Sequence, residues 1–241
     1  METYTYPVAT IKNMNKGTVF LIAISLLLLL INCDSKREGK KLDSLEIGPE
    51  KQKDTFNLLT DIKPLCADGD INAVIEIPAG TIDKWELDKT TGKIRWEMIE
   101  GIPRVVNYIG YPGNYGMVPQ TLLSKEKGGD GDPLDVLVLG PTVERGRILK
   151  SKIIGVLYLQ DGGEQDYKLI AVSSDSPMYN VNSLDELRNN YNGVLEIVQL
   201  WFMNYKGPGK VESKGFGDKK VATDILSKAI QQYEFQDNKR S

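Results

Sequence analysis

Three aspartates fall within six residues of this chain, at Asp130, Asp132 and Asp135, and Pro133 separates the last two. The chain contains no histidine, which excludes a Ser-His-Asp triad, a histidine-liganded zinc site and an imidazole general base. Converging carboxylates repel one another unless cations lie among them, and oxygen ligands suit magnesium or manganese. The motif therefore predicts a metal site where the apolar run 136–139 begins.

Three other interpretations of the acidic run were weighed against this one. A solvated acidic loop needs no function, and the run alone favours it as much as it favours a site. A helix-loop-helix calcium site requires glycine at its sixth position and glutamate at its twelfth, but counting from Asp130 these are Asp135 and Pro141. A phosphatase with an aspartyl nucleophile would place its aspartates directly after a buried strand, whereas residues 124–129 are polar.

Further acidic and basic side chains lie at the ends of predicted elements. Asp161 and Asp166 fall on one predicted hairpin connection, where they would complete a metal site begun by Asp130 and Asp135. Five carboxylates need several cations, and phosphate is the natural ligand to bridge several magnesium ions. Basic and phenolic side chains at such ends can hold phosphate oxygens. The candidates are Lys84, Arg104, Tyr115, Tyr205 and Lys206.

Short strands followed by helices would position these residues. The hydrophobic pattern predicts strands at 73–78, 84–88, 93–96, 135–139, 153–159 and 168–172. The stretch 108–116 is rich in glycine and tyrosine and predicts a loop that passes close to other backbone. Ser183 and Glu186 form a capping box that opens a helix, interrupted near Gly193, and a second helix covers 219–235. We predict a mainly β fold with α, a small closed OB-like β-barrel with two C-terminal helices packed outside.

The N-terminal residues predict export. Lys16 precedes an apolar run at 19–31, which is short for a membrane span and suits the core of a signal peptide. We predict a signal peptide at 1–32, with Met14 as an alternative start. The residues before Cys33 resemble a bacterial lipoprotein signal, in which the cysteine is lipidated. A plain signal-anchor and a disulfide between Cys33 and Cys66 are the alternatives.

Domain organisation and location follow from this interpretation. We predict a lipidated cysteine and polar tether at 33–64 and a catalytic domain at 65–241. The expected location is a bacterial cell envelope, with a membrane anchor at the N-terminus, or the cytoplasm if no signal is present. The formal net charge of −3 argues against nucleic acid as a partner.

Five ordered segments resemble the soluble family I inorganic pyrophosphatases. Residues 130–136 are similar to the family's signature, 74–78 to its opening strand and 114–116 to its substrate-side loop. Residues 155–169 are similar to its second metal-binding segment, and Tyr205-Lys206 to its phosphate-binding pair. The resemblance implies magnesium-dependent hydrolysis of inorganic pyrophosphate to two phosphates by direct attack of a metal-bridged water. It also implies a homo-oligomer, and the oxygen-only ligands allow manganese as a substitute metal.

The resemblance also implies a role for each site residue. Asp132 would accept the proton of the attacking water, and Arg95 is the alternative to Arg104. The implied metal ligands are Asp130, Asp135, Asp161 and Asp166; the substrate contacts are Lys84, Arg104, Tyr115, Tyr205 and Lys206; the supporting residues are Glu76, Glu86 and Lys168. The competing hypothesis is a lipid-tethered, calcium-dependent binding module of the cell envelope, which leaves the basic residues without a role.

Overall fold

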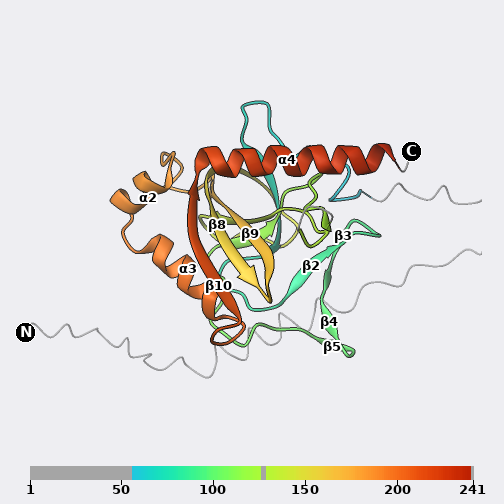
Figure 1. Cartoon of the computed structure of the whole chain (residues 1–241), viewed down its shortest axis with the longest axis horizontal. Helices are drawn as coiled ribbons and strands as arrows, with labels where there is room; N and C mark the ends of the chain where they lie inside the picture. The colour runs from blue at the N-terminus through green and yellow to red at the C-terminus, as the bar shows by residue number, and fades with distance from the viewer. Residues whose placement is uncertain (1–55, 126–128, 240–241) are drawn as a thin grey trace, which may run out of the picture. The chain divides into compact units, whose positions relative to one another are not determined.

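A six-stranded sheet organises the described residues, which are 56–125 and 129–239 of this computed structural model (Figure 1). In sheet order the strands are β1 (Ile71–Ile77), β6 (Asn114–Met117), β7 (Asp135–Leu139), β9 (Glu164–Ser173), β8 (Ile148–Asp161) and β10 (Val211–Asp218). The pairs are antiparallel except β7 with β9. β1 also pairs with β8, so the pairing continues from β8 back to β1.

Two hairpins project from this sheet. The first joins β2 (Trp85–Asp88) to β3 (Lys93–Trp96), and the second joins β4 (Met98–Ile99) to β5 (Ile102–Pro103). Trp85 and Trp96 are cross-strand partners whose rings stack at 5.1 Å between centroids. The guanidinium of Arg145 lies 4.1 Å from the Trp85 ring centroid. The stacked rings therefore hold the two strands of this hairpin together, and the cation–π contact joins the hairpin to the rest of the domain.

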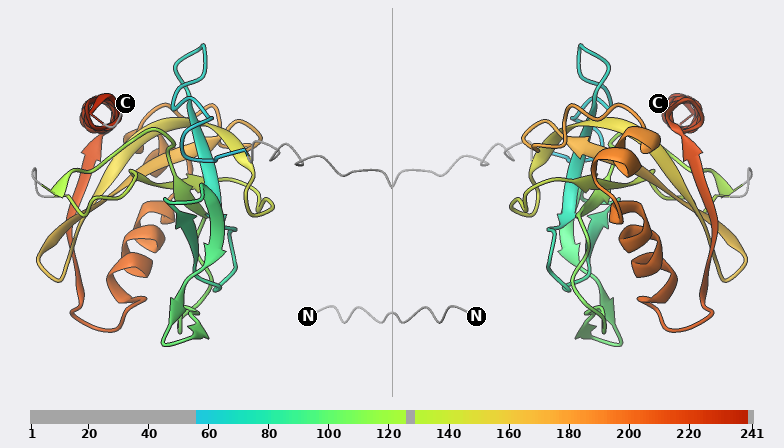
Figure 2. Two further views of the ribbon diagram at one scale, coloured as in Figure 1. Left: turned by 90° about the vertical axis from the view of Figure 1, so that its right-hand side faces the viewer. Right: turned by 90° about the vertical axis from the view of Figure 1, so that its left-hand side faces the viewer.

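Three helices occur in the described part of the chain: α2 (Leu184–Asn190), α3 (Val194–Asn204) and α4 (Lys219–Asn238). The Ser183 hydroxyl accepts a hydrogen bond from the Glu186 amide at 3.1 Å, which confirms the predicted cap. Gly193 has φ of 88° and separates α2 from α3, as the sequence predicted. α3 packs in the core that includes Val211 of β10, whereas α4 packs mainly over β8 in the other core (Figure 2).

Alternation along the strands produces two cores. On β7, the side chains of Leu137 and Leu139 join the core beneath α2 and α3, whereas those of Val136 and Val138 join the core beneath α4. All four are almost fully buried. Because both faces of this strand are covered, its sequence is continuously apolar rather than alternating.

The prediction of a mainly β domain is confirmed, and several element bounds differ from those predicted. β3 and β7 have the predicted bounds, while β8 and β9 are longer at both ends. β10 and the β4–β5 hairpin were not predicted. The prediction of a loop through residue 116 was wrong at its end, where Asn114–Met117 forms β6. Its close backbone approach is confirmed, since a Cβ on Gly116 would lie 1.9 Å from the Val74 carbonyl oxygen.

The predicted signal peptide 1–32, with its alternative start Met14, and the lipidation site Cys33 lie outside the described residues. Part of the predicted tether is described, and there Ile62 is buried against Val74, Leu87 and Met117. Among the residues whose structure is described, no helix combines the length and apolar character needed to cross a membrane.

Candidate active site

Strand ends bring the predicted acidic residues to one edge of the sheet. Asp135 opens β7, and Asp161 ends β8. Asp166 lies near the start of β9, where the turn after β8 returns the chain. Parallel pairing of β7 with β9 sets Asp135 opposite Lys168. Residues about 30 apart in sequence thus become neighbours through strand register.

A buried lysine joins two of these carboxylates. The ammonium of Lys168 donates to Asp135 Oδ2 and to Asp166 Oδ1, and only 5% of its side chain is exposed. Burial opposes its positive charge, but the two carboxylates outweigh burial and raise the pKa of Lys168. The same ammonium lies 5.5 Å from the ring centroid of Tyr115. Lys168 therefore holds the two aspartates together.

The loop before β7 is shaped by its own aspartates. The Asp130 carboxylate accepts a hydrogen bond from the Asp132 amide at 2.9 Å, and Gly131 between them has φ of +85°. Burial raises the pKa of the Asp130 carboxyl, and the charges of Asp132 and Asp135 raise it further. Asp130 is therefore close enough to the other two carboxylates of the motif to be affected by their charges.

Helix α4 supports this loop through the segment that precedes it. The Leu122 amide donates to the Ala229 carbonyl at 3.0 Å, and the Ser124 amide donates to Gln232 Oε1 at 2.8 Å. Leu123 in turn exchanges backbone hydrogen bonds with the loop, at 2.8 Å to the Asp132 carbonyl and 2.7 Å from the Gly131 amide.

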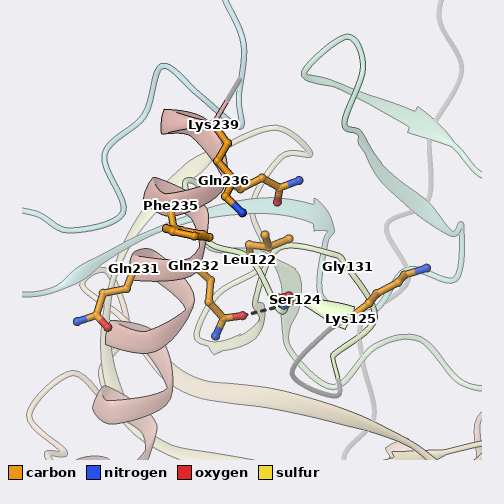
Figure 3. Close-up of a pocket in the computed structure, with 9 residues that line it drawn as sticks. All are labelled: Leu122, Ser124, Lys125, Gly131, Gln231, Gln232, Phe235, Gln236 and Lys239. Carbon is orange, nitrogen blue, oxygen red and sulfur yellow. Dashed lines mark hydrogen bonds between the residues drawn. The ribbon is translucent and has the colours of Figure 1, made fainter. Parts of the chain in front are cut away.

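A cavity of about 800 Å³ lies beside these contacts (Figure 3). Gln232 points toward Ser124, while the neighbouring Gln231 points away (Figure 3). The cavity is lined by Leu122, Ser124, Lys125, Gly131, Gln231, Gln232, Phe235, Gln236 and Lys239.

An aromatic cluster forms the side of the site that carries the predicted phosphate contacts. Tyr205 stacks on Trp201 with 4.8 Å between centroids, and Tyr111 lies 4.3 Å from Trp201 and 5.2 Å from Tyr115. Burial raises the pKa of Tyr111, Tyr115 and Tyr205. These phenols therefore remain protonated at neutral pH and can donate hydrogen bonds.

The predicted cations also reach this region. Lys84 Nζ lies 5.6 Å from the Tyr115 ring centroid, and Lys206 donates to Asp161. Arg104 donates to both oxygens of Glu97, at 2.8 and 2.7 Å. Of the two candidate arginines, Arg104 is partly buried and pairs with Glu97, whereas Arg95 is exposed and pairs with Asp88.

Glu76 and Glu86 are two acidic residues near Lys84, whose positive charge acts on both carboxyl groups. Glu76 is 5% exposed, and its Oε1 accepts a hydrogen bond from the Leu87 amide at 2.7 Å. Burial raises the pKa of Glu76 to about 8, with Lys84 lowering it and Asp135 raising it. Burial also raises the pKa of Glu86, which Lys84 partly offsets.

Among the described residues, the predicted metal site is not assembled as expected. Within 56–125 and 129–239, no three side chains among aspartate, glutamate and cysteine converge as a ready metal site. Lysines intervene instead: Lys168 between Asp135 and Asp166, and Lys206 against Asp161. Their ammonium groups supply the positive charge that these carboxylates require.

A model of the inorganic pyrophosphatase family matches residues 73–234, which include every candidate site residue except Cys33. The chain belongs to this family.

Individual relatives agree with the assignment. The inorganic pyrophosphatase of Campylobacter jejuni is 37% identical over an alignment of 170 residues that covers 68% of this chain and 91% of the relative. The human inorganic pyrophosphatase is 35% identical over 190 residues, 68% of this chain and 64% of its own length. Among solved structures, the type I inorganic pyrophosphatase from P. falciparum matches with a TM-score of 0.69 at 28% identity, over 79% of this chain and 68% of that one. The Helicobacter pylori pyrophosphatase matches with a TM-score of 0.59 at 35% identity, over 68% and 94%.

Sequence reasoning missed two residues that contact the candidate site residues. Tyr111 is 3% exposed between Tyr115 and Trp201, and its position four residues before Tyr115 was the available signal. Lys89 donates to Asp132, which lies 43 positions later in the chain, and no pattern in the sequence signalled this contact.

Proposed function

We propose that this pyrophosphatase hydrolyses inorganic pyrophosphate to two phosphates in a magnesium-dependent reaction, by direct attack of water. The observation that carries the proposal is the sheet edge at which Lys168 joins Asp135 to Asp166, with the same ammonium beside the Tyr115 ring and with Asp130 near enough to Asp135 to be affected by its charge. Hydrolysis needs a nucleophile at neutral pH and relief of charge on a highly anionic substrate. The carboxylates would hold the cations that activate water as the nucleophile, and the basic side chains would offset the charge of the substrate.

The residues present fit hard divalent cations. Asp130, Asp135, Asp161 and Asp166 would hold magnesium, with manganese as a substitute, because they offer only carboxylate oxygens. The raised pKa of Asp130, due to burial and to its acidic neighbours, marks a place where added positive charge is favourable. When bound, such ions lower the pKa of water and neutralise substrate charge.

Side chains of the protein would then accept the proton and bind the phosphate groups. Asp132 accepts the proton of the attacking water. Lys84, Arg104 and Lys206 bind phosphate oxygens as cations. Lys206, which donates to Asp161 in this structure, would give up that contact when it binds the substrate. The protonated phenols of Tyr115 and Tyr205 donate to the same oxygens. The supporting residues Glu76, Glu86 and Lys168 keep these groups in place.

Further proposals concern the assembly and location. We propose that the pairing from β1 around to β8 closes a small OB-like barrel, with the return pairing of β1 and β8 as support. A homo-oligomer is supported by large apolar side chains that remain exposed in the described residues, among them Ile109, Ile197 and Leu200. The N-terminal sequence supports export to a bacterial cell envelope and a lipid anchor at Cys33, with the cytoplasm as the alternative.

A phosphate-release assay tests the proposed reaction. Purified full-length chain should release phosphate from pyrophosphate with magnesium, and calcium should inhibit because it is larger and less strict in geometry. The calcium-dependent binding module would instead bind calcium and release no phosphate. Folded protein that releases none with magnesium or manganese would overturn the proposed function.

A further inference from the structure

Lys89 reaches the proposed proton acceptor from a distant hairpin. Its ammonium donates to Asp132 Oδ1 and to the Gly131 carbonyl oxygen, the latter at 3.2 Å. Both side chains of the ion pair are 52% exposed, so the contact lies at the mouth of the site rather than in the core. Lys89 belongs to none of the residues to which the family resemblance gave a role.

The turn that carries Lys89 is held by its own hydrogen bonds. Asp88 Oδ1 accepts from the Thr90 amide at 2.8 Å and from the Thr91 amide at 3.3 Å. The Gly92 amide donates to the Asp88 carbonyl at 2.8 Å, which closes the turn. Aspartate in this position commonly organises such turns.

A second set of contacts fixes the turn to the domain. The Leu58 amide donates to the Gly92 carbonyl at 2.9 Å. A Cβ on Gly92 would lie 2.1 Å from the Asn57 side chain, so the two segments are in close contact. Lys89 therefore extends from a supported base and not from a free loop tip.

Hydrogen bonds hold both the backbone and the side chain of Asp132. Its backbone carbonyl accepts from the Leu123 amide, and its own amide donates to Asp130. Its side chain is held through Oδ1 by Lys89, while the same ammonium binds the preceding carbonyl of Gly131. A lysine that binds both groups restricts rotation of the carboxylate and keeps one oxygen engaged.

We propose that Lys89 is a positioning residue that orients the Asp132 carboxylate so that its second oxygen faces the attacking water. The inference rests on the proposed role of Asp132 as proton acceptor. It predicts an effect on the rate of the chemical step and little effect on substrate affinity. A purely structural surface ion pair would change neither.

The test compares Lys89→Met with Lys89→Arg and with the control Lys93→Met, an exposed lysine on the same hairpin. In the full-length chain with saturating magnesium, Lys89→Met should lower kcat about fivefold, the upper range for a half-exposed ion pair. KM for pyrophosphate should change little. Lys89→Arg should recover most of the rate, and Lys93→Met should match wild type. Circular dichroism melting should show all variants folded.

A double-mutant cycle then tests whether Lys89 acts through Asp132. If it does, Lys89→Met should have no further effect in an Asp132→Asn background. Equal losses in both backgrounds, an unchanged kcat in the single variant, or a raised KM with unchanged kcat would each overturn the inference. An inactive wild type in the same assay would instead overturn the proposed function, so the two failures are distinguishable.

Discussion

Lys168 lies where two aspartates of neighbouring strands would otherwise repel each other. Transfer of its charge into the protein costs several kcal/mol, which only paired carboxylates can offset. Both partners are present, since Asp135 and Asp166 accept from the same ammonium. The buried ammonium of Lys168 thus fixes the relative position of two proposed metal ligands. Metal ions that bind these carboxylates would find them already positioned.

Glu76 gives the metal-free protein a characteristic dependence on pH. Its pKa is raised from 4.5 to about 8, mainly by burial. The folded protein therefore retains a proton that the unfolded chain loses above pH 4.5. The free energy of unfolding should fall as pH rises through this window, by up to about 1.4 kcal/mol per pH unit, and level off above it.

Glu76→Gln should remove this dependence because the amide stays neutral while its oxygen can still accept from the Leu87 amide. Urea unfolding in EDTA at pH 5, 7 and 9 compares the two proteins. The variant should gain stability relative to wild type between pH 5 and pH 9. A difference that does not vary with pH would contradict this origin.

Asp132 and Asp135 should respond differently to the same change. Asp132→Asn should keep most magnesium binding and lower kcat by about 10²-fold or more, because an amide cannot accept the proton. Asp135→Asn should weaken magnesium binding first, since it removes a ligand and one partner of Lys168. Magnesium titration of activity separates the two effects. Equal metal affinity and equal residual rate would contradict this division of roles.

The aspartates were predictable because their motif is local in sequence. Asp130, Asp132 and Asp135 lie within six residues, and their residue type alone limits the chemistry. Tyr111 and Lys89 gain their places through contacts made by the fold. Lys89 meets Asp132 only because the β2–β3 turn is fixed beside the loop, and no local pattern encodes that contact.

At the scale of elements, the strands with strong apolar patterns were the predictable ones. β7 is a continuous apolar run after Asp135, and its bounds were predicted. β10 was missed because its sequence is polar and contains two glycines, Gly215 and Gly217. It is an edge strand whose pairing with β8 supplies the order that its own composition does not.

Helix α4 should affect catalysis although it contributes no residue to the proposed chemistry. Gln232 accepts from the Ser124 amide, and the segment 122–124 supports Gly131 and Asp132. Gln232→Leu removes the acceptor and leaves that part-buried amide unpaired. The free energy of unfolding should fall by about 1–2 kcal/mol, and kcat should fall with it.

Gln231→Leu is the matched control, since Gln231 points away from Ser124 (Figure 3). Chemical unfolding and steady-state kinetics on both variants make the comparison. If the two substitutions have the same effect on kcat, the hydrogen bond between Gln232 and Ser124 does not position the loop that carries Asp132.

At the scale of the whole molecule, the family assignment accounts for the catalytic domain, but it gives no role to the residues that precede that domain. The family model covers 73–234, and the described structure begins at residue 56. The fold neighbours share this domain, as shown by TM-scores of 0.69 and 0.59. Export therefore rests on the sequence of the first 33 residues, and it has to be tested by the chemistry of Cys33.

Lipidation should decide where the whole chain resides. In a bacterial host, wild-type chain should partition with membranes and carry acyl chains on Cys33, because each buried methylene contributes about 0.8 kcal/mol. Cys33→Ser should block acylation and signal cleavage together, so the variant should migrate as the longer precursor and retain pyrophosphatase activity.

Cys66→Ser provides the control, because Cys66 lies in the folded domain, where its thiol donates to Asn72 Oδ1 at 3.2 Å. That variant should be processed and partitioned like wild type. Mass spectrometry of the purified wild-type protein identifies the N-terminal residue and its modification. An unmodified Cys33 within an intact N-terminus would exclude the lipoprotein hypothesis, and the activity would then belong to a chain without this anchor.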